Sequence, residues 1–121
     1  MPPRTKKSSG LGPVAAFRRI ALSMPGAEEQ AHMNHPDFRV NGRIFATLGY
    51  PDKNWGMVAL TPEEQREFVK EYPAIFKPAN GAWGRQGATG VQLDAADEET
   101  LGRAITIAWQ NAMRKKPARR K

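Results

Sequence analysis

Two arginines in a predicted β-hairpin are the residues whose type and spacing most clearly suggest chemistry. Residues 38–48 alternate apolar and polar side chains around Asn41-Gly42, a pattern typical of a hairpin. A two-residue loop at Asn41-Gly42 would mix charged and apolar side chains on both faces, whereas a three-residue loop over 40–42 separates them. The second register, which we favour, places Arg39 directly opposite Arg43. Because opposed cations repel each other, this pair predicts a counter-charge, either a bound anion such as a phosphate or a nearby glutamate.

A glycine-rich segment supplies a second candidate. In Trp83-Gly84-Arg85-Gln86-Gly87 the aromatic ring could stack on a base, while Arg85 and backbone N–H groups could hold a phosphate. The alternative is a β-turn whose tryptophan covers the edge of the core. We favour the turn for Trp83, because tryptophan rarely leaves so much apolar area exposed.

The other reactive residue types are too few or too poorly spaced for catalysis. The two histidines, His32 and His35, match no metal-binding motif, and we expect a structural or turn role for them. The chain has no cysteine, and Ser23, which is the only serine after the first ten residues, has no recognisable triad partner. No P-loop or dinucleotide-binding glycine signature is present. We therefore predict no enzyme activity, no metal site and no cofactor.

The elements that must position these residues alternate between helices and strands. Apolar spacing predicts helices over 13–24, 62–72 and from Asp97 to about Met113. The second helix begins with a capping box at Thr61-Pro62-Glu63-Glu64, and Asp97 can cap the third. Strands are predicted over 28–32, the hairpin, 55–60 and 89–94. This order predicts an α+β fold in which an antiparallel sheet has its helices packed on one face.

The excess of positive over negative charge is confined to the two ends of the chain. Residues 1–7 and 114–121 carry nine bases and no acid, so the formal charge of +7 leaves 7 − 9 = −2 for residues 8–113. We predict a disordered basic tail over 1–10, one domain over 11–113 and a basic tail over 114–121. The tail residues expected to contact phosphates are Lys115, Lys116, Arg119 and Arg120. No apolar run is long enough to span a bilayer, so we expect a soluble, cytoplasmic monomer without a membrane partner.

Several blocks of the sequence together resemble the MmcQ/YjbR family. They are Met24-Pro25-Gly26, residues 35–48 (HPDFRVNGRIFATL), Leu60-Thr61-Pro62-Glu63-Glu64, Gly81-Ala82-Trp83-Gly84 and Ala108-Trp109. The resemblance covers residues 14 to 113 and implies a fold similar to frataxin and CyaY, described as a double-wing DNA-binding arrangement. Frataxin binds iron and has an acidic first helix. Here the first helix has Arg18 and Arg19 and no acid, which disfavours an iron-binding role.

Two functional hypotheses follow from the sequence. The first is a non-enzymatic DNA-binding protein in which Arg39, Arg43 and Arg85 contact phosphates and the basic tails add affinity. The second is a protein-interaction or small-ligand-binding domain whose basic tails are incidental. The two hypotheses differ in whether DNA binding depends on residues of the fold or on the tails alone.

Overall fold

The computed structural model describes residues 12–49 and 53–114. In chain order the elements are α1 (Pro13–Ser23), β1 (Glu28–His32), β2 (His35–Val40), β3 (Arg43–Leu48), β4 (Trp55–Ala59), α2 (Pro62–Glu71), β5 (Phe76–Pro78), α3 (Gly81–Arg85), β6 (Ala88–Gln92), the 3-10 turn η1 (Leu93–Ala95) and α4 (Glu98–Arg114). All three predicted helices form. The predicted strands form within about two residues of their expected limits, except that β2 begins at His35, three residues before the predicted start of the hairpin. The short helix α3 and strand β5 were not predicted as such.

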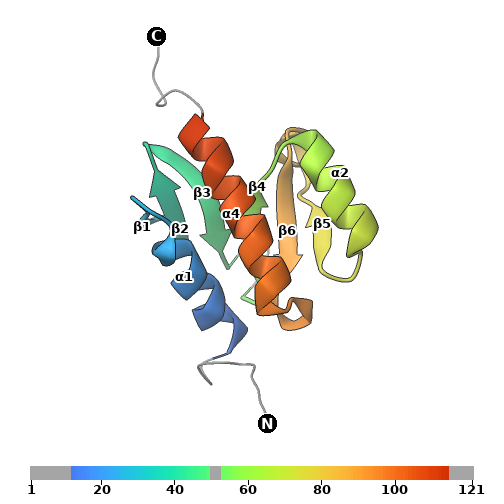
Figure 1. The fold of residues 1–121 in the computed structure, drawn as a ribbon, viewed down its shortest axis with the longest axis horizontal. Helices are drawn as coiled ribbons and strands as arrows, with labels where there is room; N and C mark the ends of the chain where they lie inside the picture. Colours follow the sequence, from blue (N-terminus) through green and yellow to red (C-terminus); the bar gives the residue numbers. More distant parts are fainter. Residues whose placement is uncertain (1–11, 50–52, 115–121) are drawn as a thin grey trace.

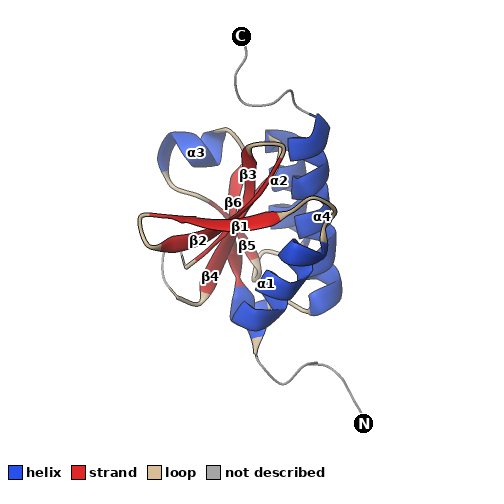
Figure 2. Ribbon diagram, turned by 90° about the vertical axis from the view of Figure 1, so that its left-hand side faces the viewer, coloured by secondary structure: helices blue, strands red, loops and turns tan. Residues whose placement is uncertain are grey.

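The strands form one antiparallel sheet with a layer of helices on one side. Its strand order is β1-β2-β3-β4-β6-β5, so β1 and β5 are the edges (Figure 1). Figure 2 shows α1, α2 and α4 on one side of the sheet and α3 on the other. The α+β class is therefore confirmed, with the three long helices on one face. We call the sheet face turned away from these three helices the open face.

The predicted caps fix where the helices begin. Glu64 N–H donates to the Thr61 hydroxyl at 3.1 Å, and Thr61 N–H donates to the Glu64 carboxylate at 2.9 Å, which completes the capping box. Thr100 N–H donates to the Asp97 carboxylate at 2.9 Å, and this bond holds the pKa of Asp97 below its usual value. α4 continues to Arg114, so this arginine is the last helical residue and not the first residue of the basic tail.

The core lies between the sheet and the long helices. Phe17 of α1, Phe38 of β2, Phe45 of β3 and Ile105 of α4 have no exposed surface. Gly56 on β4 allows α1 to approach the sheet closely, because a Cβ at this position would lie 2.7 Å from the Phe17 ring. The close contact places Phe17 directly on the centre of the sheet.

The register of the β2–β3 hairpin differs from our prediction. Val40 pairs with Arg43 and Arg39 with Ile44, so the loop consists of Asn41 and Gly42 alone. Both loop residues have positive φ, 58° and 77°, as a tight hairpin turn requires. The mixing of side chains that argued against this turn is present at these two pairs, but it does not continue along the strands. A bulge between Phe38 and Arg39 shifts the register by one residue, so that Phe38 pairs with Ala46 on the core face.

The terminal segments expected to be tails, 1–10 and 114–121, lie outside the described residues except for Arg114. Lys115, Lys116, Arg119 and Arg120 are among them. Within 12–49 and 53–114, none of the helices has the length and apolar character needed to cross a membrane.

Candidate functional site

One residue from each strand contributes to a row across the open face. The Phe38 ring lies 6.1 Å from the Phe17 ring of α1, so the adjacent residues of β2, Asp37 and Arg39, point to the open face. The strand pairings then align Gln30, Asp37, Thr47, Met57, Gly90 and Lys77 from one edge of the sheet to the other. The open face thus has a row of mostly polar, charged and small residues, whereas the opposite face of the sheet packs against the hydrophobic core.

A buried carboxylate organises the β1–β2 end of the open face. Asp37 has no exposed surface. Arg39 donates from Nε to Asp37 Oδ1 at 2.8 Å and from Nη2 to Oδ2 at 3.1 Å. His32 Nδ1 is hydrogen-bonded to the same Oδ2 at 2.7 Å. Because an ionised carboxylate can only accept hydrogen bonds, Nδ1 of His32 carries the proton.

The Asp37–Arg39 pair stabilises both charges. The hydrogen bonds from Arg39 lower the pKa of Asp37 below its usual 3.8, with a further lowering from His32, and these effects outweigh the opposing effect of burial. The same bonds raise the pKa of Arg39. The carboxylate is therefore ionised at neutral pH, and Arg39 is held in one orientation by two parallel bonds.

This geometry corrects our expectation for the two hairpin arginines. Arg39 does not oppose Arg43, and it forms an ion pair with Asp37, two residues earlier in the same strand. Arg43 pairs with Val40, whose side chain belongs to the core, so its register position lies on the side of the long helices. The structure therefore places the two arginines on opposite faces of the sheet.

The segment expected to be a β-turn with a core-covering tryptophan is the helix α3, and the tryptophan is exposed. Trp83 is 54 % exposed, and Arg85, two residues later, is also exposed. The helix is fixed in place by Gln65 of α2, a buried side chain whose Nε2 donates to the carbonyl oxygens of Gly84 and Ala88, each at 2.9 Å. The helix α3, which Figure 2 shows on the side of the open face, therefore contains an exposed tryptophan and an exposed arginine.

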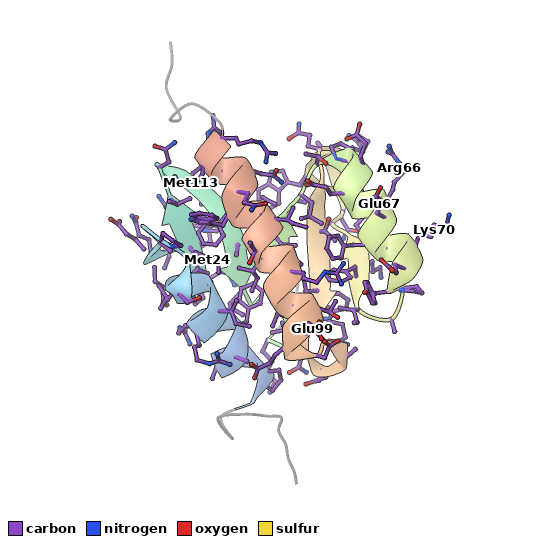
Figure 3. The ribbon with its side chains drawn as sticks, viewed as in Figure 1. Met24, Arg66, Glu67, Lys70, Glu99 and Met113 are labelled. Atoms are coloured by element: carbon purple, nitrogen blue, oxygen red, sulfur yellow. The ribbon has the colours of Figure 1, made fainter. Side chains whose placement is uncertain are left out.

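The layer of long helices has a different character. Arg66, Glu67 and Lys70 project outward from α2, and Glu99 lies at the start of α4 (Figure 3). Acids and bases are interleaved along this surface of α2, in agreement with a solvated helix face. We see no concentration of positive charge on the described part of this helix.

The structure gives the histidines a role that the sequence did not reveal. His32 bonds to Asp37, and the His35 ring centroid lies 6.5 Å from that of His32. No group of three or more potential metal-ligating side chains is present within the described part of the chain. Part of the His32–Asp37–Arg39 cluster could have been predicted from the sequence. Asp37 and Arg39 are two residues apart in a strand, and such residues share a face.

Comparisons with known proteins agree with this architecture. The sequence model of the YjbR family matches residues 22–111. The crystal structure of the Deinococcus radiodurans protein DR2400, a DUF419 domain, superposes with a TM-score of 0.72 at 18 % sequence identity, over 86 % of this chain and 80 % of that one. No curated protein matches the sequence. The structural likeness concerns the fold alone.

Proposed function

We propose that this chain, which belongs to the YjbR family, is a non-enzymatic protein that binds nucleic acid through the open face of its sheet. The observation that carries the proposal is Arg39, which Asp37 holds in one orientation on a face that the long helices leave uncovered. The basic terminal segments add affinity, and we expect the protein to act as a cytoplasmic monomer.

Arg39 keeps hydrogen-bonding capacity for a phosphate. Its bonds to Asp37 use Nε and Nη2, and no hydrogen bond within the described residues involves Nη1. The side chain is 29 % exposed. A guanidinium with an unused amino group can donate to a phosphate oxygen while the carboxylate keeps it oriented. Asp37 thus acts as the positioning residue for Arg39.

Trp83 and Arg85 supply a second contact on the same side of the sheet. Their helix adjoins β6, and β6 is three strands from β2 in the sheet order, which corresponds to about 14 Å. An extended strand of nucleic acid could therefore contact both Arg39 and α3. The exposed tryptophan favours an unpaired base as its partner, since base–aromatic stacking needs an accessible base face.

Arg43 belongs to a different contact. Figure 1 places the β2–β3 turn at the same end of the molecule as the C-terminal end of α4. We propose that Arg43 acts there together with the bases that follow α4 in the sequence, Lys115, Lys116, Arg119 and Arg120. These contacts are electrostatic and independent of base sequence.

Two adjacent glutamates offer a matched test of which face binds nucleic acid. Glu28 and Glu29 are both exposed on β1, but Glu28 pairs with Arg39 on the open face, whereas Glu29 lies on the other face and forms an ion pair with Arg18 at 3.1 Å. Glu28→Gln and Glu29→Gln change the net charge equally. We expect Glu28→Gln to tighten binding of a labelled oligonucleotide by about two- to fivefold at low salt, because it removes a repelling charge beside the phosphate.

The comparison has clear contrary outcomes. Equal tightening in both variants would place the nucleic acid away from the open face, since only net charge would then matter. Greater tightening in Glu29→Gln would move the interface to the side of the long helices. Absence of binding to single-stranded and duplex oligonucleotides at low salt would overturn the proposal itself.

A further inference from the structure

The His32–Asp37–Arg39 cluster contains two nitrogen atoms, His32 Nε2 and Arg39 Nη1, that are not bonded to the carboxylate that joins the two side chains. His32 uses Nδ1 for Asp37, and no hydrogen bond within the described residues involves its Nε2. Arg39 likewise has Nη1 unused by any described residue. Both side chains are partly exposed, at 32 % and 29 %, while Asp37 between them is fully buried. An anion approaching the open face can therefore reach His32 and Arg39 but not Asp37.

The net charge of this cluster depends on one proton. With a neutral His32 ring, the charges of Asp37 and Arg39 cancel. A proton on His32 Nε2 gives the cluster a net charge of +1 and converts Nε2 from an acceptor into a donor. Because Asp37 fixes the ring through Nδ1, Nε2 has the same orientation in both states.

Among residues 12–49 and 53–114, few other charged groups face His32. β1 is an edge strand, so only β2 pairs with it. The residues of β2 that face His32 are Asp37 and Arg39 of the cluster and His35, which pairs directly with His32. From β1 itself, Glu28 lies on the same face, opposite Arg39. Thr47, which opposes Asp37 from β3, is uncharged.

We infer that His32 and Arg39 together bind one phosphodiester group of the nucleic acid, and that His32 takes part only when its ring is protonated. This inference rests on the proposed function, because nucleic acid supplies the anion. The affinity of the open face is then linked to pH, and proton uptake by His32 accompanies binding. Imidazole is the side chain suited to such a link between pH 5 and 8.

The test measures binding of oligothymidine to the full chain between pH 5 and 8 at constant ionic strength. Oligothymidine is chosen because its bases and phosphodiesters do not titrate in this range. We expect the affinity of the unchanged protein to rise roughly tenfold as the pH falls, in proportion to one added charge-assisted hydrogen bond. His32→Gln, which can still donate to Asp37, should lose most of this rise. His35→Gln is the matched control and should retain it.

A second measurement uses the unchanged protein and does not depend on how a variant folds. Saturating oligothymidine should move the NMR titration midpoint of the His32 ring upward, because ligand and proton binding are reciprocal. It should leave the midpoint of the His35 ring nearly unchanged.

The outcomes separate this inference from the proposed function. If the chain binds oligothymidine equally well at all pH values, or if His32→Gln keeps the full rise, the inference is wrong and the proposed function stands. The inference is also wrong if saturating oligothymidine leaves the NMR titration midpoint of the His32 ring unchanged. If the chain binds neither oligothymidine nor a mixed-sequence oligonucleotide at any pH, both fail.

Discussion

Asp37 is a carboxylate with no exposed surface on the sheet face that the long helices leave uncovered. An unpaired buried charge would be costly, and Arg39 and His32 compensate for it with three hydrogen bonds. The cluster links β1 to β2 while it leaves Arg39 and His32 partly exposed to solvent. Stability and candidate function therefore depend on the same residues, and a variant of Arg39 has to be judged on both.

Arg39→Gln should destabilise the protein in a pH-dependent way. At pH 7 we expect a loss of about 3 kcal/mol, because Asp37 would keep a buried charge without its guanidinium partner. The folded-state pKa of Asp37 is lowered from 3.8, so the pair contributes its full stability above that value and loses it as the pH falls through the lowered folded pKa. The difference between variant and unchanged protein should therefore shrink below about pH 4, as measured by urea unfolding from pH 2 to 7.

Arg85→Gln is the control for the removal of one positive charge. Arg85 is exposed, so we expect its replacement to change stability by less than about 0.5 kcal/mol at every pH. Equal destabilisation by both variants would contradict the account of Asp37. An Arg39→Gln variant as stable as the unchanged protein would contradict that account as well.

At the scale of single residues, the sequence identified Arg39 and Arg85 as candidate phosphate-binding residues. It did not identify the residues that surround them in the fold. The counter-charge of Arg39 was expected from a bound anion or a glutamate, because its predicted neighbour across the hairpin was Arg43. Residues two apart in a strand are equally close neighbours on one face, and Asp37 and Arg39 are such a pair. Trp83 was assigned to the core edge from its apolar area, and no local pattern shows that the core is complete without it.

At the scale of elements, the long helices were predictable and the hairpin register was not. Helix limits follow from local rules, such as the Thr61 capping box. The register depends on a bulge, which shifts the alternation of β3 relative to β2. A face-segregation argument assumes an unbroken ladder, so it selected the wrong loop length although Asn41-Gly42 is the typical two-residue turn.

The short helix α3 depends on tertiary contacts that its sequence does not reveal. A Cβ on Gly84 would lie 1.7 Å from the Ala79 carbonyl oxygen, and one on Gly87 would lie 1.9 Å from that of Leu60. Gln65, from a distant part of the chain, bonds to the end of the helix. Glycine is thus required here for close backbone approach, whereas the sequence pattern suggested a turn.

Two helical glycines should respond in opposite ways to alanine. Gly84→Ala must displace the Ala79 carbonyl, so we expect a loss of about 2 kcal/mol or more, comparable to overpacking of a core. Gly102 lies within α4, and a Cβ there would meet nothing within 4 Å. Gly102→Ala should therefore add up to about 1 kcal/mol through helix propensity. Chemical unfolding measures both, and a Gly84→Ala variant as stable as the unchanged protein would show that α3 is not held tightly.

At the scale of the whole molecule, the proposed function combines two kinds of nucleic-acid contact. Arg39 lies on the open face, and Trp83 and Arg85 belong to α3 on the same side of the sheet, whereas the other candidates besides Arg43, namely Lys115, Lys116, Arg119 and Arg120, follow α4 in the sequence. Residues 8–113 have a net charge of −2, so the net charge of the fold does not attract a polyanion. Long-range attraction would come from the terminal bases, and orientation would come from the open face.

These two contributions should respond differently to salt. Replacing Lys115, Lys116, Arg119 and Arg120 by glutamine removes cations that neutralise phosphates. The slope of log affinity for a single-stranded oligonucleotide against log salt should therefore fall by up to about 0.7 for each phosphate that is no longer neutralised. Trp83→Ala removes base stacking, which releases no counterions. It should weaken binding roughly tenfold at every salt concentration and leave the slope unchanged.

The two variants together decide whether the fold or the terminal segments recognise the nucleic acid. If Trp83→Ala changes neither affinity nor slope while the glutamine variant abolishes binding, the terminal charges bind alone and the fold has another role, such as protein interaction. If the glutamine variant keeps the full slope, the counterions are released elsewhere, and Lys77 in the row across the open face becomes the first residue to replace. A reduced salt slope in the glutamine variant, together with a weaker affinity but unchanged slope in Trp83→Ala, would support both contributions. The fold would then position the nucleic acid, and the charged ends would attract it.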